Sequence, residues 1–338
     1  MSETAATSQA AVPLPGRLAA TDRRTVGILV MFAALAVVPL LARYGAQGYI
    51  LAIFTRVMIF AIAALSLDIL LGYGALVSFG HAAFLGIGSY AVGILSSHGY
   101  DNLLLHLLVA IAASALFALA TSTISLRTTG VYYIMSTLAF GQMLFFVGVS
   151  LSAYGGDDGM TLAGRSRVFG TSLIASDTAF YYLVLALLIL FTWLAQRLIG
   201  SRFGRVLRGA RENPQRMRAI GFEPFHYQLI ACMLAGMMCG VAGVLLANQA
   251  MFVSPAYMTW QRSGDLLIIV LLGGAGTLVG PILGAAAFLL LEEWLSGLTE
   301  QWKLIFGPLL VLSVLFARGG IMGLLGRVAK RRPGERDG

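Results

Sequence analysis

The sequence contains little charge and almost no lysine. Only 11% of its 338 residues are charged, and Lys303 and Lys330 are its only lysines. A nucleotide-binding P-loop needs a lysine directly after a glycine to hold the phosphates, whereas these two lysines follow Trp302 and Ala329. The sequence therefore excludes a P-loop ATPase, and any ATP that drives this protein must be hydrolysed by another polypeptide.

Cysteine and histidine are also scarce. The two cysteines, Cys232 and Cys239, lie on one predicted helix about 10 Å apart along its axis, which is beyond the usual disulfide reach. The four histidines show no metal-ligand spacing. We therefore expect no metal site and no cofactor, and no cluster of polar residues indicates a catalytic centre.

Long apolar runs make up most of the chain, which is 58% hydrophobic with a mean hydropathy of +0.84. A bilayer crossing needs roughly 20 apolar residues. A soluble helical protein would have amphipathic helices, whereas these runs are apolar on all sides. The expected fold class is therefore all-α, a polytopic integral membrane protein. Its apolar segments lie at residues 26–42, 49–71, 75–97, 103–126, 131–151, 178–198, 227–250, 264–297 and 304–317.

Basic residues predict the orientation. Most of the 23 arginines and lysines fall before residue 25, at Arg127, between Arg197 and Arg218, and from Arg318 to the end. By the positive-inside rule, all four places are cytoplasmic. Two cytoplasmic termini require an even number of crossings, whereas the chain has nine apolar segments. One segment must therefore contain an extra crossing or none.

Residues 264–297 are the segment that can change this number. As one helix they would cover about 51 Å, too long for a hydrocarbon core of about 30 Å and too short for two full spans. Irregular backbone survives at membrane depth only where protein or a water-filled cavity satisfies it. We predict two short half-helices that meet at a central loop, giving about ten membrane helices (8–10). The loop contains Gly273, Gly274, Gly276, Gly280 and Pro281.

A second glycine-rich stretch matches this loop. LLGYGALVSFGHAAFLG begins at Leu70, and LLGGAGTLVGPILGAAA begins at Leu271. Paired interrupted segments indicate a transport site between the halves of a pseudo-symmetric two-half arrangement. The alternative is close helix packing, the role that we assign to Gly236 and Gly240. We favour a translocation pathway, whose candidate residues are Ser78, Phe79, Gly80, His81, Gly273, Gly274 and Gly276.

Three polar residues inside apolar segments are ambiguous. His81 makes either a structural hydrogen bond or a substrate contact. Asp68 and Arg56 lie about 18 Å apart on one predicted helix, so they cannot pair with each other. An ionisable residue inside a membrane is a functional candidate by default, although Asp68, near a helix end, has a structural role as its alternative.

Three long motifs together resemble a known family. They are GYGALVSFGHAAFLGIGSYAVGIL (72–95), RENPQRMRAIGFEPFHYQLIACMLAGMMCGVAGVLLA (211–247) and VLLGGAGTLVGPILGAAAFLLLEEWL (270–295). In the same order, over about residues 50–320, the chain is similar to the permease subunits of ABC importers for branched-chain amino acids, of the LivM type. Three motifs in register are far more specific than hydropathy alone.

The resemblance implies a permease without enzymatic activity, in a bacterial inner membrane, that translocates branched-chain or similar amino acids. It implies three kinds of protein partner: a homologous second permease subunit that completes a heterodimer, two ABC ATPase subunits, and a periplasmic or extracellular solute-binding protein that delivers the small-molecule substrate. Membrane lipid surrounds such a chain, and we expect no nucleic-acid partner.

The polar stretch RENPQRMRAIGFEP interrupts the apolar chain. The resemblance implies a coupling helix that contacts the ATPase subunits, with Glu212 and Gly221 at its motif positions. The residues themselves predict a short helix, because Asn213 suits an N-cap, Pro214 the first helical position and Gly221 the C-cap. The expected coupling residues are Arg211, Glu212, Asn213, Arg216, Arg218 and Gly221.

The coupling stretch departs from the family at one point. Many importers have two alanines after the glutamate, whereas Arg216 and Met217 stand there in this chain. We therefore expect more electrostatic docking, with Arg211, Arg216 and Arg218 meeting acidic or backbone groups on the partner. The alternative is a basic loop that only fixes topology or touches anionic lipid.

The expected organisation has three regions. Residues 1–25 form a mobile cytoplasmic tail, 26–318 the transmembrane permease domain and 319–338 a basic cytoplasmic tail. Within the domain, 199–226 is the cytoplasmic coupling loop and 152–177 an external loop. The external loop resembles the glycine-rich loop that faces the binding protein, and its alternative is an ordinary turn. The implied contact residues are Gly155, Gly156 and Gly159.

Other functions remain open at this stage. Similar permeases handle urea, short-chain amides and other amino acids. A stand-alone secondary transporter would need intramembrane carboxylates for its coupling ion, and Asp68 is the only acid near such a depth. A membrane-embedded enzyme would need clustered catalytic residues. An ATPase subunit that co-purifies with the chain would separate the importer from both of these.

The arginine distribution makes a direct prediction about topology. A reporter domain fused after Arg208 and another fused after Lys330 should both be cytoplasmic, because both follow basic segments. A reporter inserted at Gly156 should be external. Phosphatase and fluorescent-protein fusions measure the side directly, and a cytoplasmic Gly156 contradicts the predicted topology.

Overall fold

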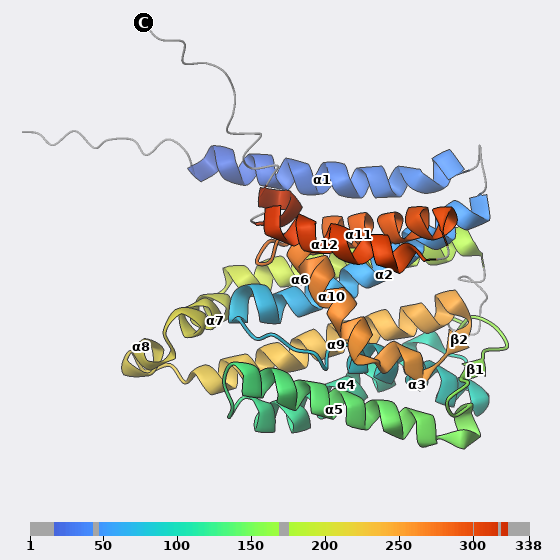
Figure 1. Cartoon of the computed structure of the whole chain (residues 1–338), viewed down its shortest axis with the longest axis horizontal. Helices are drawn as coiled ribbons and strands as arrows, with labels where there is room; N and C mark the ends of the chain where they lie inside the picture. Colours follow the sequence, from blue (N-terminus) through green and yellow to red (C-terminus); the bar gives the residue numbers. More distant parts are fainter. Residues whose placement is uncertain (1–16, 43–46, 169–175, 300, 317–318, 324–338) are drawn as a thin grey trace, which may run out of the picture.

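The computed structural model describes residues 17–42, 47–168, 176–299, 301–316 and 319–323 (Figure 1). Within these ranges the chain is almost entirely helical, with two short strands. The elements in chain order are α1 (Arg17–Ala42), α2 (Gln47–Asp68), η1 (Ile69–Tyr73), α3 (Ala82–Ser97), α4 (Leu103–Ser125), α5 (Val131–Ser150), η2 (Ser152–Tyr154), β1 (Met160–Thr161), α6 (Asp177–Gly200), α7 (Arg202–Glu212), α8 (Pro214–Ala219), α9 (Pro224–Ala250), β2 (Phe252–Val253), η3 (Pro255–Met258), α10 (Trp260–Gly273), α11 (Gly280–Leu298) and α12 (Trp302–Phe316).

Among the described residues, six helices are long and apolar enough to cross a membrane. The expected all-α membrane fold is therefore confirmed, whereas the expected number of about ten spans is not. Helices α3 and α10 are short because the chain leaves the helical conformation before α3 and after α10, and the apolar part of α1 (Gly27–Leu40) and α12, with 15 residues, are short as well. The six are Gly48–Tyr73, Leu103–Ser125, Val131–Ser150, Asp177–Gly200, Pro224–Ala250 and Gly280–Leu298.

Helices α2 and α9 form the centre of the bundle. In each of them, 72% of the most apolar window is buried inside the protein, compared with 17% in α5. Figure 1 shows the same order, with α9 running between other helices and α5 on the outer edge. The protein core therefore surrounds α2 and α9, and α5 leaves most of its apolar surface uncovered.

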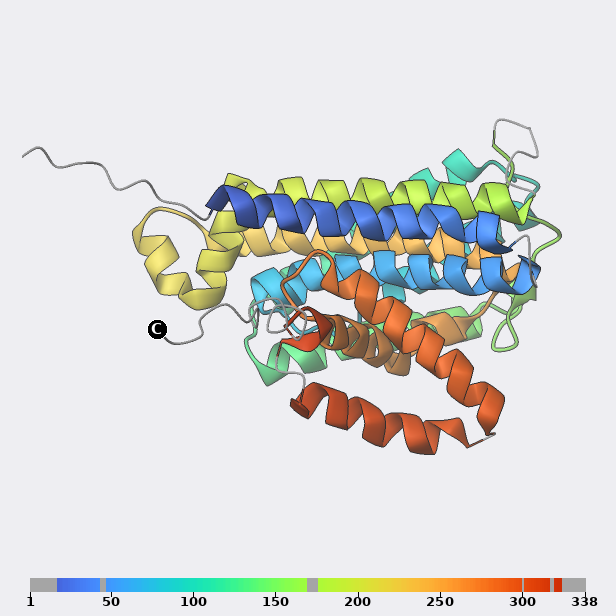
Figure 2. The same cartoon turned by 90° about the horizontal axis from the view of Figure 1, so that it is seen from above.

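The two ends of the bundle carry different structures. Figure 1 places α7 and α8 at one end and the strands β1 and β2 at the other, and Figure 2 gives the same separation from above. The start of α1 and the end of α12 lie at the end that carries α7 and α8. This arrangement agrees with the side of the membrane predicted for the arginines, and the orientation itself stays a prediction.

Two boundaries differ from those expected from the sequence. Helix α1 begins at Arg17, well before residue 26, so the expected tail of residues 1–25 already contains helix. The interruption in 264–297 is confirmed, but α11 has 19 residues and is long enough to span, so only α10, with 14, is a short half-helix. Residues 1–16 and 324–338 of the expected tails lie outside the described residues.

Glycines allow α3 and α9 to touch backbone to backbone. A Cβ atom on Gly88 would overlap the carbonyl oxygen of Gly240, and a Cβ on Gly243 would overlap the carbonyl oxygen of Leu85. A Cβ on Gly236 would lie 2.7 Å from the ring of Phe84. The packing role expected for Gly236 and Gly240 is therefore confirmed, because both face neighbouring helices at close range.

This contact predicts a loss of stability in Gly88→Ala. The added methyl group has no space, and overpacking of this kind costs about 1–3 kcal/mol. Thermal unfolding in detergent should show a lower midpoint. Gly264→Ala is the matched control, because nothing lies within 4 Å of a Cβ at that helical position. Equal midpoints for the two variants would contradict the close contact.

Candidate functional site

The first interruption of the helical chain follows α2. The π-helix η1 ends at Tyr73, the backbone between Gly74 and Ala82 is not helical, and α3 begins at Ala82. Side chains from other helices accept hydrogen bonds from the backbone of this segment. Phe79 N donates to Thr137 Oγ1 (3.3 Å), and Ala82 N donates to Ser263 Oγ (3.0 Å). This is the condition under which non-helical backbone is stable inside a membrane protein.

Two cavities follow this first break. One of about 390 Å³ lies at the α7 end, where Gly74–Val77, the turn between α4 and α5, and Arg211 line it. A smaller one of about 30 Å³ is lined by the next residues, including Ser78 and His81. Tyr133 lines both cavities. The non-helical segment therefore borders two cavities, and the larger one lies beside Arg211.

His81 occupies a buried position with a structural hydrogen bond. Its Nε2 lies 2.8 Å from Ser66 Oγ, and this hydroxyl donates to Ala63 O (2.7 Å). Ser66 therefore joins His81 to the backbone of α2. Its Nδ1 has no hydrogen-bond partner among the described residues. This hydrogen bond gives His81 the structural role that was one of its two expected alternatives. A contact between His81 and substrate stays a prediction.

Gly80 is explained by packing against α5. A Cβ atom there would overlap the carbonyl oxygen of Thr137, and Gly141 on α5 faces Gly80 in return, with a Cβ only 3.1 Å from the Gly80 Cα. The close approach holds the first break against α5. A larger residue at position 80 would therefore displace α5 as well as the break.

The second interruption joins α10 to α11. Gly274 (φ +114°) and Gly276 (φ +77°) adopt backbone conformations that favour glycine. Thr277 closes the loop, since its Oγ1 donates to Gly274 O (2.6 Å) and accepts from Gly280 N (3.1 Å). The loop is a tight hairpin, so the two breaks differ in form although their sequences are alike.

The two breaks meet at Asp68. Its Oδ1 accepts a hydrogen bond from Gly276 N (2.7 Å), and the residue is only 1% exposed. This bond gives Asp68 the structural role that was one of its two expected alternatives. Arg56 does not contact Asp68 and lies 3.7 Å from Glu292. The candidate pathway residues of the two breaks therefore belong to neighbouring elements, 208 positions apart in sequence at this contact.

The loop of residues 199–226, expected to be cytoplasmic, contains two helices where the sequence predicted one. Helix α7 was missed, although Val206, Leu207 and Ala210 form a buried apolar face among its arginines. That spacing is the signal of an amphipathic helix and could have predicted it. Helix α8 was predicted correctly, and every one of its residues is at least partly exposed. Figure 1 shows α8 projecting from the end of the bundle.

The predicted caps of α8 are confirmed. Asn213 Oδ1 accepts from Arg216 N (2.9 Å), and Pro214 is the first helical residue. At the other end, Gly221 (φ +92°) donates to Arg218 O (2.9 Å), and the next N–H, of Phe222, donates to Met217 O (3.0 Å). These two bonds form a Schellman motif, which satisfies the last carbonyls of the helix.

The arginines of the loop have different surroundings. Arg211, which we expected to face a partner, donates through Nη1 to the carbonyl oxygen of Gly72 at the first break. Arg218 lies 3.6 Å from Glu223 in an exposed ion pair. Glu212 and Arg216 are exposed. Arg211 therefore connects the loop to the membrane segments, while the exposed charges remain accessible.

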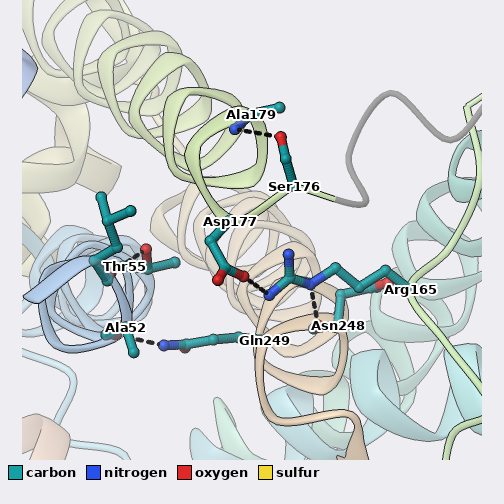
Figure 3. A network of polar contacts seen from close by, with 9 residues as sticks. Ala52, Thr55, Arg165, Ser176, Asp177, Ala179, Asn248 and Gln249 are labelled. Atoms are coloured by element: carbon teal, nitrogen blue, oxygen red, sulfur yellow. Dashed lines mark hydrogen bonds and ion pairs between the residues drawn. The ribbon is translucent and has the colours of Figure 1, made fainter. Parts of the chain in front are cut away.

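At the opposite end, Arg165 holds the loop between α5 and α6, expected to be external, to two helices (Figure 3). Its Nη2 lies 2.6 Å from Asp177 Oδ1 at the start of α6, and its Nε donates to Asn248 O (3.3 Å) near the end of α9. The guanidinium also lies 4.9 Å from the ring centre of Phe180. Asn248 in turn accepts from Ser166 N (2.7 Å).

The polar contacts among Arg165, Asp177 and Asn248 were not predicted from the sequence. Asn248 inside an apolar helix was an available signal, because buried amides need partners. The ion pair of Arg165 with Asp177 carried no local signal. The external loop is thus held in place by side chains from α6 and α9, outside the residues 169–175 that the structure does not describe.

The three glycines expected to contact a binding protein form a tight turn at the end of the bundle that carries the strands. Gly155, Gly156 and Gly159 all have positive φ, and a Cβ on Gly159 would overlap Val253 O. The strand β1 follows directly and pairs with β2, Met160 opposite Val253. The turn therefore has a structural reason for its glycines, and the contact with a binding protein stays a prediction.

Comparison with known proteins identifies relatives over most of the chain. A family model described as "Branched-chain amino acid transport system / permease component" matches residues 49–315. The LivM permease protein of the high-affinity branched-chain amino acid transport system of Salmonella typhimurium is 29% identical over 312 residues, which cover 85% of this chain and 73% of that protein. The LivM protein of Escherichia coli K12 is 29% identical over 311 residues with the same coverage.

A further similar protein is the autoinducer 2 import system permease LsrC of Yersinia pestis. It is 27% identical over 223 residues, which cover 62% of this chain and 62% of that protein. No solved structure gives a significant match to the chain.

The cap of α8 makes a testable prediction. Asn213→Ala removes the acceptor for Arg216 N, which should cost about 1 kcal/mol of helix stability and raise amide exchange in α8 roughly fivefold. Hydrogen–deuterium exchange at Arg216 and Met217 measures this. Gln215→Ala, which keeps the cap, is the control. Unchanged protection in Asn213→Ala would show that α8 does not depend on its cap.

Proposed function

This chain belongs to the family of branched-chain amino acid transport system permease components, and we propose that it translocates branched-chain or similar amino acids as the permease subunit of an ABC importer. The observation that carries the proposal is the family match over residues 49–315, which contain both breaks and the cytoplasmic loop. The apolar helices and the similarity to LivM make it a multi-pass protein of the inner membrane. Both termini are proposed to be cytoplasmic.

Two features support an energy source outside the chain. The sequence has no P-loop lysine, and the short capped helix α8 offers an exposed surface at the end of the bundle. We propose that two ATPase subunits serve the importer and that one contacts Glu212, Arg216 and Arg218 on this surface. The caps at Asn213 and Gly221 would hold these charges in a fixed arrangement.

We propose that the translocation pathway runs beside the two breaks. Ser78 and His81 line the smaller cavity, and Gly74–Val77 line the larger one beside the loop. Gly273, Gly274 and Gly276 form the second break, which contacts the first. A homologous second permease would complete the pathway as a heterodimer, opposite apolar surface that this chain leaves uncovered.

The external end is proposed to receive the solute-binding protein. The turn with Gly155, Gly156 and Gly159 lies in a loop that Arg165 holds against α6 and α9. A loop fixed in this way presents the same surface in every cycle, which suits recognition of a folded partner. The substrate class is the one in the names of the LivM relatives, and urea or a short-chain amide is the alternative.

The test of the proposed function uses Glu212→Ala combined with Gly221→Leu. The first change removes an exposed charge, and the second strains a helix end at φ +92°. We expect the complex with the ATPase subunits to weaken at least tenfold in co-purification. Uptake of radiolabelled leucine and ATP hydrolysis stimulated by the binding protein should fall together.

Gly99→Leu is the matched control, because Gly99 has a similar φ of +81° and open space around it, but lies in the turn between α3 and α4 at the opposite end. It should leave association with the ATPase unchanged. If the double variant keeps wild-type association and stimulated hydrolysis, the loop serves topology alone. If the wild-type chain itself associates with no ATPase subunit, the proposed function is wrong.

A further inference from the structure

Three contacts connect the cytoplasmic loop to both breaks. Arg211, the residue before Glu212 in α7, donates to the carbonyl oxygen of Gly72 in η1. Gly72 packs against Gly276, and Gly276 N donates to the carboxylate of Asp68. We name these four residues, Arg211, Gly72, Asp68 and Gly276, the junction. It brings together α7, the end of α2 and the loop between α10 and α11.

The junction has no free space. A Cβ atom on Gly72 would overlap both Asp68 Oδ1 and Gly276 N, and it would lie 2.6 Å from the Gly276 Cα. Gly276 needs its own glycine conformation, with φ +77°. Because the two backbones touch and the side chain of Asp68 accepts a hydrogen bond from Gly276 N, neither break can shift at this point without displacing the other.

The buried carboxyl group of Asp68 also needs its partner in the junction. Asp68 is buried, and its Oδ2 has no hydrogen-bond partner among the described residues. A buried carboxylate is costly unless an opposite charge or donors compensate it. Gly276 N supplies one donor to Asp68. Arg211 belongs to the same junction through its hydrogen bond to the carbonyl oxygen of Gly72 in η1, four residues after Asp68.

The place of Arg211 in the chain links the junction to α8. Arg211 lies in the last turn of α7, and Asn213, two residues later, caps α8. The apolar face of α7 is buried, so this helix is anchored while α8 projects. A force on α8 therefore reaches Arg211 through two residues of backbone, and reaches Gly72 through one hydrogen bond.

We infer that Arg211 and Asp68 are positioning residues that transmit movement of the cytoplasmic loop to both breaks of the membrane pathway. Arg211 joins the loop to the first break, and Asp68 joins the first break to the second. This inference rests on the proposed function, because it assigns to the junction the coupling of ATP hydrolysis to transport. If the inference is correct, a broken junction allows ATP hydrolysis to continue while substrate uptake falls.

The first test replaces Arg211. In proteoliposomes that hold the whole importer, Arg211→Ala should keep ATPase association within twofold of wild type, because α8 is intact. The number of substrate molecules taken up per ATP hydrolysed should fall at least tenfold. Arg211→Lys, which keeps a positive donor, should restore a substantial part of this ratio. Arg205→Ala, on the same helix and also exposed, is the control and should keep the wild-type ratio.

The second test replaces the buried side of the junction. Asp68→Ala removes the acceptor for Gly276 N and should lower the same ratio at least tenfold. Asp68→Asn keeps an acceptor oxygen and places an amide donor where Oδ2 lacks a partner, so it should recover most of the ratio. Gly72→Ala should resemble Asp68→Ala, because its methyl group forces the breaks apart. Size-exclusion elution of each complex checks that it is assembled.

A double-mutant cycle decides whether the residues act together. If they form one path, Arg211→Ala combined with Asp68→Ala should lower the ratio no further than either change alone. Independent, multiplying losses would overturn the inference, as would a wild-type ratio in Arg211→Ala. Failure of the proposed function would look different, because the wild-type chain would then bind no ATPase subunit or show no substrate uptake.

Discussion

Backbone that leaves a helix inside an apolar protein needs hydrogen-bond partners, and the centre of this molecule is arranged around that requirement. The first break is satisfied by hydroxyl groups of Thr137 and Ser263, which come from α5 and α10. The second is closed by Thr277 and joined to α2 by Asp68. Thr137, Ser263 and Asp68 lie on three different helices, whereas Thr277 belongs to the second break itself, so the breaks bring α5, α10 and α2 together.

The sequence predicted those parts whose signal is local. The glycines and Pro281 indicated the second break, and Asn213 with Gly221 indicated the short capped helix α8. Both are confirmed, because caps and breaks depend on residues within a few positions. Helix α7 was missed because the many arginines of this stretch indicate a polar loop. The buried residues Val206 and Leu207 nevertheless lie on one face of a helix.

The remaining differences are long-range. The contact between Asp68 and Gly276 joins positions 208 residues apart, and nothing near either residue specifies it. Arg211 looked like any other exposed arginine of the loop, whereas its side chain turns to Gly72. The expected number of spans was not confirmed because hydropathy measures how apolar a segment is, and α3 and α10 are apolar but interrupted. Tertiary contacts, which hydropathy does not measure, determine where these helices are interrupted.

The two ends of the protein differ in how firmly they are held. At one end, every residue of α8 is at least partly exposed, and the helix has a cap at each end. At the other, Arg165, Asp177 and Asn248 tie a loop to the ends of two long helices (Figure 3). Local stability follows the density of such contacts, so the first end is the more adaptable surface and the second the more rigid one.

The glycine contact between α3 and α9 has a consequence for how the pathway can change shape. With Gly88 and Gly243 pressed against opposing backbone, α3 and α9 touch without side chains between them. Helix α9 starts at Pro224, soon after α8, while α3 starts at Ala82, where the first break ends. A tilt of α9 would therefore press directly on α3, the helix whose first residue ends the break.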